Sequence, residues 1–283
     1  MEEKSDESMT GQAPPEAFHN YQGLCWWCGK LADSKEHRHK RTDVARIFKD
    51  GGKDGRVARG VGGSDHLQFI QSENSDNLKF SNVLCSACNN TRSQPFDKAY
   101  AEFSRYFHQN EDAIALRGSF QLSAIYGREW RDRRRLLTKY FVKHIGCRMA
   151  EDRVPIPEAV VDFLNISKAP LPHLQLGMGI NLAKHEMEIH LRDFHGIDGR
   201  GSWVGDHGCH YSSHSGRIIQ TFGHLGFDSF TLSYQCILDD KHGGENYFHG
   251  NKVTLDSFWP DGFEPGSGAE MCDECKTGAK FQD

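Results

Sequence analysis

Two pairs of cysteines with the same two-residue gap constrain the fold of this chain more than any other feature. Cys25 and Cys28 flank Trp-Trp, and Cys85 and Cys88 flank Ser-Ala. A lone pair at this spacing serves redox exchange, a disulfide or half of a metal site, whereas two pairs suit a tetrahedral zinc ion bound by four thiolates. The redox alternative expects a βαβ pattern beside one pair, which the sequence lacks. We therefore predict a structural zinc, because four thiolates leave no coordination position for water or substrate.

The odd number of cysteines and the character of the first residues favour a reducing compartment. Nine cysteines cannot all pair as disulfides. Residues 1–19 are acidic and polar, without the basic start and apolar stretch of a secretory signal, and we expect a disordered tail there. No apolar run approaches the roughly 20 residues of a membrane span. We therefore expect a cytoplasmic protein with no membrane partner, whose thiols stay reduced.

Charge is distributed unevenly along the chain. The formal net charge is −5, which by itself disfavours a nucleic-acid ligand. Residues 20–150, however, carry 23 basic and 14 acidic side chains, whereas residues 151–283 are strongly acidic. The middle of the chain could therefore attract a polyanion, or it could form solvated charged helices. Arg131 and Arg134, in a cluster of four arginines, are the substrate-binding candidates of this region.

Residue periodicity divides the chain into segments. Apolar residues at helical spacing predict a helix that begins near Pro95 and a second helix over 130–147. From about Leu174 the pattern becomes strand-like, in MEIHLRDF, GRIIQTFG, FTLSYQCIL and KVTLDSF. We predict an α+β protein with five segments: a disordered tail (1–19), a zinc-binding module (20–110), a helical segment (111–170), a β-rich or α+β C-terminal domain of unknown role (171–262) and a flexible tail (263–283).

A carboxylate, an imidazole and an amide accompany the cysteines. The predicted zinc brings the Glu36-His37 segment next to the Asn89-Asn90 segment. The order of the motifs is Cys25-Trp-Trp-Cys28, Glu36-His37, Asn82-Val-Leu-Cys85 and Cys85-Ser-Ala-Cys88-Asn89-Asn-Thr-Arg92. This order resembles the cysteine-bearing members of the HNH endonuclease superfamily, which have a ββα-metal fold of treble-clef type. The resemblance covers about residues 20–100, roughly a third of the chain.

The resemblance implies a role for each polar residue of the motifs. Glu36 and Asn89 are expected to ligate a catalytic divalent ion, Mg²⁺ or Mn²⁺, since oxygen ligands suit these cations. His37 is expected to be the general base, because an unperturbed pKa near ~6.5 lets it take a proton from water at neutral pH. Asn82 is expected to brace the His37 loop, and Arg92 to contact a phosphate.

Each of these assignments has an alternative. Asn77 competes with Asn82 for the central position, and Asn90 competes with Asn89 if the helix is rotated. Asn89 and Asn90 could also cap the helix that follows them, since Asn is a good N-cap. Arg92 could be a structural ion-pair residue.

The residues after Glu36 depart from the family pattern. The family often carries an apolar residue after the histidine and a proline two residues later, whereas this chain has His37-Arg38-His39-Lys40. His39 could therefore share the work of His37, and Glu36 and His37 could be no more than polar surface. Cys272 and Cys275 form a third pair without a visible partner pair.

These features together predict a metal-dependent endonuclease that hydrolyses phosphodiester bonds, with DNA favoured over RNA as the nucleic-acid partner. A non-catalytic zinc module that binds nucleic acid or protein is the main alternative, and an RNA-cleaving toxin or effector is another. The C-terminal domain could bind a protein partner. The oligomeric state stays open.

Overall fold

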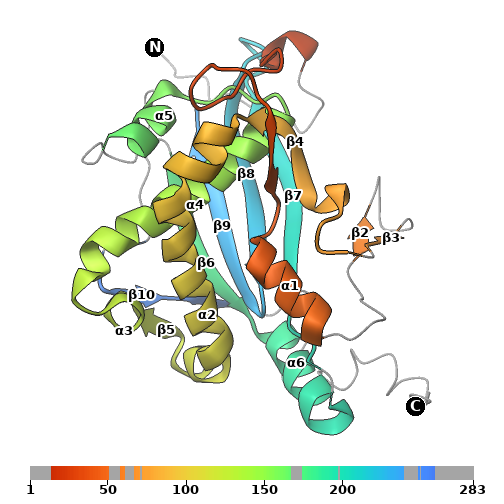
Figure 1. The fold of residues 1–283 in the computed structure, drawn as a ribbon, viewed down its shortest axis with the longest axis vertical. Coiled ribbons are helices and arrows are strands. Elements are labelled where there is room, and N and C mark those ends of the chain that lie inside the picture. The colour runs from red at the N-terminus through yellow and green to blue at the C-terminus, as the bar shows by residue number, and fades with distance from the viewer. Residues whose placement is uncertain are drawn as a thin grey trace, which may run out of the picture.

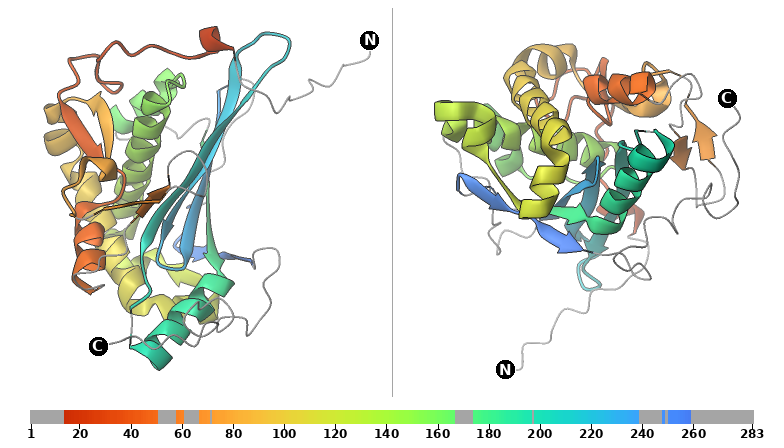
Figure 2. Two further views of the ribbon diagram at one scale, coloured as in Figure 1. Left: turned by 90° about the vertical axis from the view of Figure 1, so that its right-hand side faces the viewer. Right: turned by 90° about the horizontal axis from the view of Figure 1, so that it is seen from below.

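The computed structural model describes residues 14–50, 58–60, 67–70, 72–166, 174–196, 198–238, 248 and 250–258. Residues 1–13 of the predicted N-terminal tail, the whole of 263–283, and Cys272 and Cys275 lie outside these ranges. The described residues form an α+β fold in layers (Figures 1 and 2). Its helices are all too short or too polar to cross a membrane.

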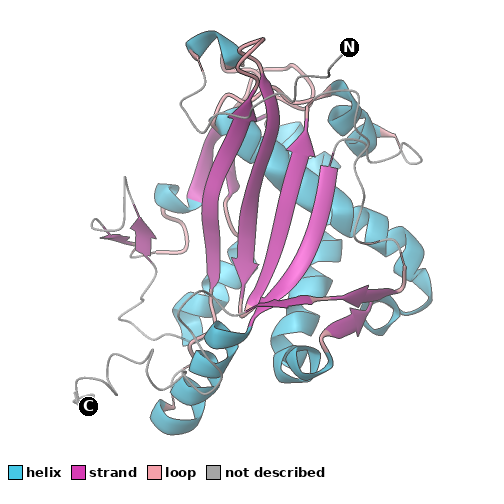
Figure 3. Ribbon diagram, turned by 180° about the vertical axis from the view of Figure 1, so that it is seen from behind, coloured by secondary structure: helices cyan, strands magenta, loops and turns pink. Residues whose placement is uncertain are grey.

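The largest layer is a five-stranded sheet with the strand order β11-β6-β9-β8-β7 (Figure 3). Its strands are β6 (Leu174–Asn181), β7 (Ser202–Tyr211), β8 (Ile218–Phe227), β9 (Phe230–Ile237) and β11 (Asp256–Phe258). β11 pairs in parallel with β6, and the other pairs are antiparallel. The strands predicted in GRIIQTFG and FTLSYQCIL are therefore confirmed, whereas KVTLDSF contains two three-residue strands, β11 and one that pairs outside this sheet.

Two long helices cover one face of this sheet (Figures 2 and 3). They are α2 (Gln94–Arg117) and α4 (Trp130–Glu151), which confirm the two helices predicted from periodicity. In α2 the buried aromatic residues recur at helical spacing, as at Phe96, Phe103 and Phe107. In α4 every residue from 137 to 150 is buried, because this helix lies between the sheet and the N-terminal strands (Figure 2).

The N-terminal layer is an antiparallel pair of short strands, β1 (Ser34–His37) and β4 (Lys79–Leu84). The chain between them contains α1 (Arg41–Asp50), β2 (Ala58–Gly60), β3 (Leu67–Phe69) and the short helix η2 (Asp76–Leu78). After β4 the π-helical turn η3 (Ala87–Arg92) leads into α2. Two paired strands are therefore followed directly by a helix.

Short elements connect these layers. They are η1 (Pro15–Ala17), β5 (Ser119–Gln121), α3 (Leu122–Tyr126), η4 (Gly127–Glu129), α5 (Glu158–Asn165), α6 (Leu182–His195) and β10 (Lys252–Thr254). β10 pairs with β5, so the end of the described chain returns to the segment between α2 and α4.

The strand predicted in MEIHLRDF is wrong, because these residues belong to α6. Met187, Ile189 and Leu191 alternate with polar residues, which imitates the two-residue period of a strand. The capping interactions at both ends of α6 favour a helix over a strand. The Asn181 side chain accepts a hydrogen bond of 2.9 Å from the Lys184 amide, and Gly196 ends the helix in the left-handed conformation.

One apolar cluster runs through the described chain from Cys25 to Leu255. It contains residues from the predicted module, from the helical segment and from the β-rich segment, so these three share a core. A second, small cluster of Val44, Ile70 and Leu78 packs beneath α1.

Candidate functional site

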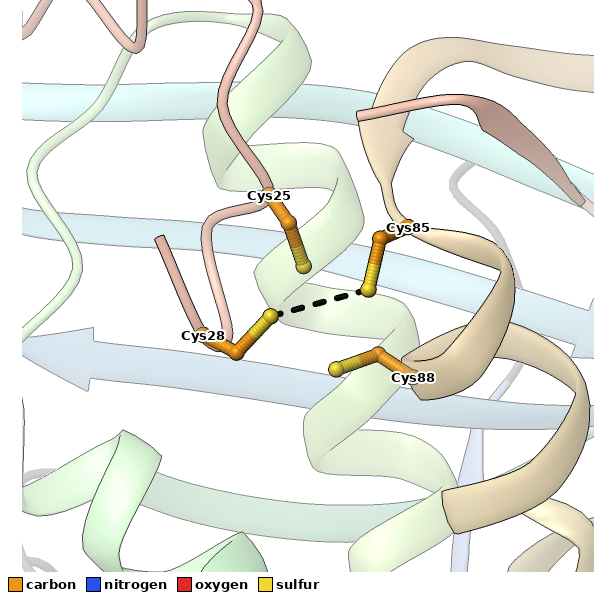
Figure 4. Close-up of side chains that lie close together, drawn as sticks. All are labelled: Cys25, Cys28, Cys85 and Cys88. Carbon is orange, nitrogen blue, oxygen red and sulfur yellow. Dashed lines mark hydrogen bonds between the residues drawn. The ribbon is translucent and has the colours of Figure 1, made fainter. Parts of the chain in front are cut away.

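Four cysteine sulfurs gather where the N-terminal loop meets η3 (Figure 4). Cys85 follows β4 directly and Cys88 lies in η3, while Cys25 and Cys28 come from the loop before β1. The four Sγ atoms lie within 4.8 Å of one another, and Cys28 Sγ is 3.6 Å from Cys85 Sγ. Zn–S bonds of about 2.3 Å place tetrahedral sulfurs about 3.8 Å apart. The tetrad can therefore hold a structural metal such as zinc, as the cysteine spacing predicts.

The local sequence shapes the first half of this tetrad. The Gly29 amide donates to the Cys25 carbonyl over 2.8 Å, and Gly29 has a φ of 72°, which glycine adopts without strain. Trp26 and Trp27, between the two cysteines, are both buried. Trp27 Nε1 donates to Asn165 Oδ1 over 2.7 Å, so the loop is anchored to the end of α5.

The thiols differ in how easily they ionise. Burial raises the pKa of Cys25 and of Cys88. Burial also opposes ionisation of Cys85, but hydrogen bonds from the Cys88 backbone and from neighbouring thiols outweigh it and lower the pKa of Cys85 to about 7. A metal ion requires all four as thiolates, so its binding would release protons.

Arg92, predicted to contact a phosphate, lies against the tetrad. Its Nη1 donates to Cys88 Sγ over 3.4 Å, and its Nη2 donates to Asn165 Oδ1 over 2.5 Å. The guanidinium carbon lies 4.6 Å from the centre of the Trp27 ring. Arg92 is thus positioned to offset the negative charge of metal-bound thiolates, which is the structural alternative named above.

Glu36, the predicted ligand of a catalytic ion, takes part in an ion-pair network. Lys143 Nζ of α4 lies 3.0 Å from Glu36 Oε1 and 3.2 Å from Asp97 Oδ1. Lys40 Nζ lies 3.1 Å from the same Asp97 oxygen. The Lys143 side chain is fully buried. Burial raises the pKa of Glu36 and Asp97 adds to this, while Lys143 and Lys40 oppose it.

His37, the predicted general base, stands opposite Lys79 in the β1–β4 pair. Its Nε2 is buried and has no hydrogen-bond partner among the described residues. Burial lowers the pKa of His37, and the nearby charges of Lys79 and Arg41 lower it further. Asn82 stands opposite Lys35, with an exposed side chain, and no hydrogen bond between described residues joins it to His37. The bracing role expected for Asn82 therefore has no counterpart in these contacts.

Asn89 lies against β1, beside Glu36. Its Nδ2 donates to Ser34 Oγ over 2.9 Å and to the Lys35 carbonyl over 3.3 Å. Its Oδ1 is buried and makes no hydrogen bond within the described chain. The neighbouring Asn90 is exposed. Asn89 lies inside η3, and the N-cap of the helix that follows, α2, is Ser93, so the capping alternative does not apply to Asn89.

His39, the alternative base, is held in a different environment. Burial lowers the pKa of His39 to about 4, and Arg38 and Arg148 lower it too. The backbone just before it is fixed by His144 Nε2, which donates to the Arg38 carbonyl over 2.5 Å. His39 is therefore neutral at pH 7.

The four arginines at the start of α4 differ in the contacts that their side chains make. Arg133 pairs with Glu102, and Arg135 donates to the Ile166 carbonyl over 3.2 Å. Arg131, which is exposed, and Arg134 lie over the Trp130 ring, at 4.7 and 5.7 Å from its centre. Arg133 and Arg135 also lie over rings, those of Tyr126 and Phe163, and the two predicted substrate-binding arginines differ from them in sharing one ring.

Sequence reasoning missed Lys143 and Asp97, the residues that surround Glu36. Asp97 is four residues after Ser93, whose Oγ donates to its Oδ2 over 2.9 Å, and this spacing fits one turn of a helix. Lys143 carries no such signal, because a lysine in a charged helix is ordinarily taken as solvent-exposed. Only the packing of α4 between two layers shows that it is buried.

Comparison of the chain with protein-family models, with curated proteins and with solved structures gave no match.

Proposed function

We propose that this chain is a metal-dependent endonuclease of the HNH type that hydrolyses phosphodiester bonds in DNA. The observation that supports it most is the position of Asn89, which lies one residue after Cys88 and is hydrogen-bonded to β1 beside Glu36. The paired strands β1 and β4, followed by a helix, are arranged in the order of a ββα-metal fold. The cysteine tetrad can hold a structural zinc, which would serve as the staple of the proposed treble clef.

The proposed chemistry assigns one task to each side chain. Glu36 and Asn89 would hold Mg²⁺ or Mn²⁺, an ion that supplies Lewis-acid stabilisation of the phosphate and of the leaving oxyanion. Asn89 Oδ1 has a free acceptor position for this purpose, since it makes no hydrogen bond within the described residues. His37 takes the proton of the attacking water, and its lowered pKa keeps the imidazole neutral at pH 7.

Two observations favour the non-catalytic zinc module instead. The ammonium of Lys143 already neutralises Glu36, and His37 Nε2 is enclosed. A divalent ion at Glu36 would have to displace Lys143 or share the carboxylate with it. The tetrad and the Arg131–Trp130–Arg134 platform need neither group and would suffice for a module that binds nucleic acid.

A cleavage assay on plasmid DNA and on total RNA, with and without Mg²⁺ or Mn²⁺, tests the proposal. We expect metal-dependent nicking of the plasmid. Cleavage of RNA alone would replace the DNA substrate by RNA and keep the mechanism. Tight binding of nucleic acid with no cleavage under any common divalent ion would contradict the enzyme and leave the zinc module as the better account.

A further inference from the structure

A second group of metal-ligating side chains lies far from the cysteines in the described chain. Glu111 comes from α2, and His185 and Glu188 come from α6, one turn apart on the same helix. One donor atom from each of the three lies within 4.8 Å of the other two. The site is where α2 and α6 approach each other beyond the end of the sheet (Figure 1).

Two donor atoms of this group are buried without a partner. Glu188 is 3% exposed, and its Oε2 makes no hydrogen bond with any described residue. His185 Nδ1 is likewise enclosed and unpaired in this part of the chain. An unpaired buried carboxylate oxygen and an unpaired buried imidazole nitrogen are each costly, and a cation held between Glu188 and His185 would satisfy both.

Other polar atoms of the three residues contact neighbours. The Ser229 amide and hydroxyl both donate to Glu111 Oε1, over 2.9 and 2.6 Å. Lys184 Nζ contacts Glu188 Oε1. Asp112 Oδ1 lies 3.8 Å from His185 Nε2, the ring nitrogen opposite the unpaired one. Hydrogen-bonded carboxylates of this kind surround metal ligands in proteins, and Asp112 is near enough to His185 for an ion pair but too far for a hydrogen bond.

We propose that Glu111, His185 and Glu188 bind a divalent transition-metal ion, which forms a second metal centre between α2 and α6. One imidazole nitrogen with two carboxylates suits Zn²⁺ or Mn²⁺, whereas Ca²⁺ and Mg²⁺ prefer sites made of oxygen alone. Among the described residues Glu188 has one ion-pair partner, Lys184, and Glu111 has none, although the charge of Arg200 acts on Glu111; a dication would offset the charge that remains. Three protein ligands leave a coordination position for water.

The competing arrangement is a proton shared by the two carboxyl groups. Burial raises the pKa of Glu188 to about 9, and the nearby Glu111 raises it further, while Lys184 opposes this. A protonated Glu188 would then need no metal. The two arrangements differ in metal content and in the response of stability to metal, and both are measurable without any cleavage assay.

Elemental analysis of zinc-loaded protein distinguishes them. We expect Glu188→Gln and His185→Gln to hold one zinc fewer per chain than the wild type. Glu186→Gln and His190→Gln replace the same residue types on the same helix outside the group, and they should keep the wild-type count. The difference between variants is the readout, because Cys272 and Cys275 could add to the total. Folded Glu188→Gln and His185→Gln proteins with the wild-type zinc count would overturn the proposal in favour of the shared proton.

A milder variant covers the case in which these substitutions prevent folding. Asp112→Asn changes the carboxylate that lies near His185 Nε2 and pairs with Arg192, and it should weaken zinc binding by about 10- to 100-fold in a chelator competition. Asp193→Asn is its control, since Asp193 also pairs with Arg192 but is not part of the group. Equal zinc affinities of the two variants would contradict the site. This result is independent of whether the chain cleaves DNA.

Discussion

Lys143 decides the electrostatics around Glu36, because it is a fully buried cation between two carboxylates. We expect Lys143→Met to lower the free energy of unfolding at pH 7 by about 3–5 kcal/mol, since it leaves Glu36 and Asp97 buried without their partner. Urea denaturation measures this. Lys139→Met, on the same helix, removes a hydrogen bond to the Leu164 carbonyl and the contacts with the Phe96 and Phe163 rings but no ion pair between described residues, and should cost less. Equal losses for the two variants would show that the ion pair is not what stabilises this region.

His37 is the residue on which the catalytic proposal depends. His37→Ala should reduce DNA cleavage by roughly 10²–10⁴-fold, the usual effect of losing a general base. Zinc content and DNA affinity should stay unchanged, because His37 is outside the tetrad and acts in the transition state. His39→Ala should reduce cleavage much less. Loss of cleavage in His39→Ala with an active His37→Ala would transfer the role of base to His39.

The pH dependence of cleavage provides a separate check on His37. A general base is active when neutral, so cleavage should fall as the pH drops through the pKa of His37. Burial and the neighbouring cations hold that pKa below its ordinary value of 6.5. The rate should therefore already be at its plateau near pH 7. A plateau reached only well above pH 7 would be inconsistent with this base.

At the scale of elements, the contact between α4 and the cysteine loop can be tested at Gly146. A Cβ at this position would lie 2.4 Å from the Trp26 ring. Alanine favours a helix over glycine by about 1 kcal/mol, so without this contact Gly146→Ala would stabilise the protein. We expect it instead to destabilise by about 1–3 kcal/mol through overpacking, and to weaken zinc binding because Trp26 adjoins Cys25.

Thermal unfolding and chelator competition measure both effects of Gly146→Ala. Gly177→Ala is the control, since a Cβ there meets nothing within 4 Å. A stabilised Gly146→Ala protein would mean that the loop moves away from α4 at little cost.

The helices and strands differ in how well the sequence pattern predicts their type and position. The aromatic spacing of Phe96, Phe103 and Phe107 is enough to locate α2, because burial on one face leaves a local pattern. In α6 the alternation of Met187, Ile189 and Leu191 favours a strand, and the helix is decided by its caps and its packing. Local patterns fail where a segment satisfies two periods at once.

At the scale of the whole molecule, the tetrad joins residues far apart in the sequence to the common core. Cys88→Ser should therefore unfold the N-terminal layer or make the protein insoluble, since structural zinc contributes ~10–16 kcal/mol of apparent binding energy. Cys209→Ser is the control, because Cys209 lies in β7 outside the tetrad. Zinc analysis and circular dichroism report the outcome. A folded, soluble Cys88→Ser protein would show that the metal is dispensable for the fold.

The candidate sites also differ in how far the sequence predicts them, because some depend on local spacing and others on contacts between distant segments. The tetrad follows from the spacing within each cysteine pair, which is local. The Lys143–Glu36 contact and the Glu111–His185–Glu188 group join segments that only the packing of layers brings together. No short-range sequence pattern predicts such contacts, and a lysine or glutamate in a helix is ordinarily expected to face solvent.

The pairing of β10 with β5 and of β11 with β6 has a consequence for how the chain is made. All four tetrad cysteines precede residue 89, whereas the last strand to join the sheet begins at Asp256. At about 5–20 residues per second, a ribosome needs roughly 10–30 s to synthesise the chain between Cys88 and Asp256. A nascent chain could therefore capture its metal while β6 still has an open edge, which is the kind of edge that attracts other strands. Translation that stops before residue 252 would release a metal-loaded product with that edge uncovered.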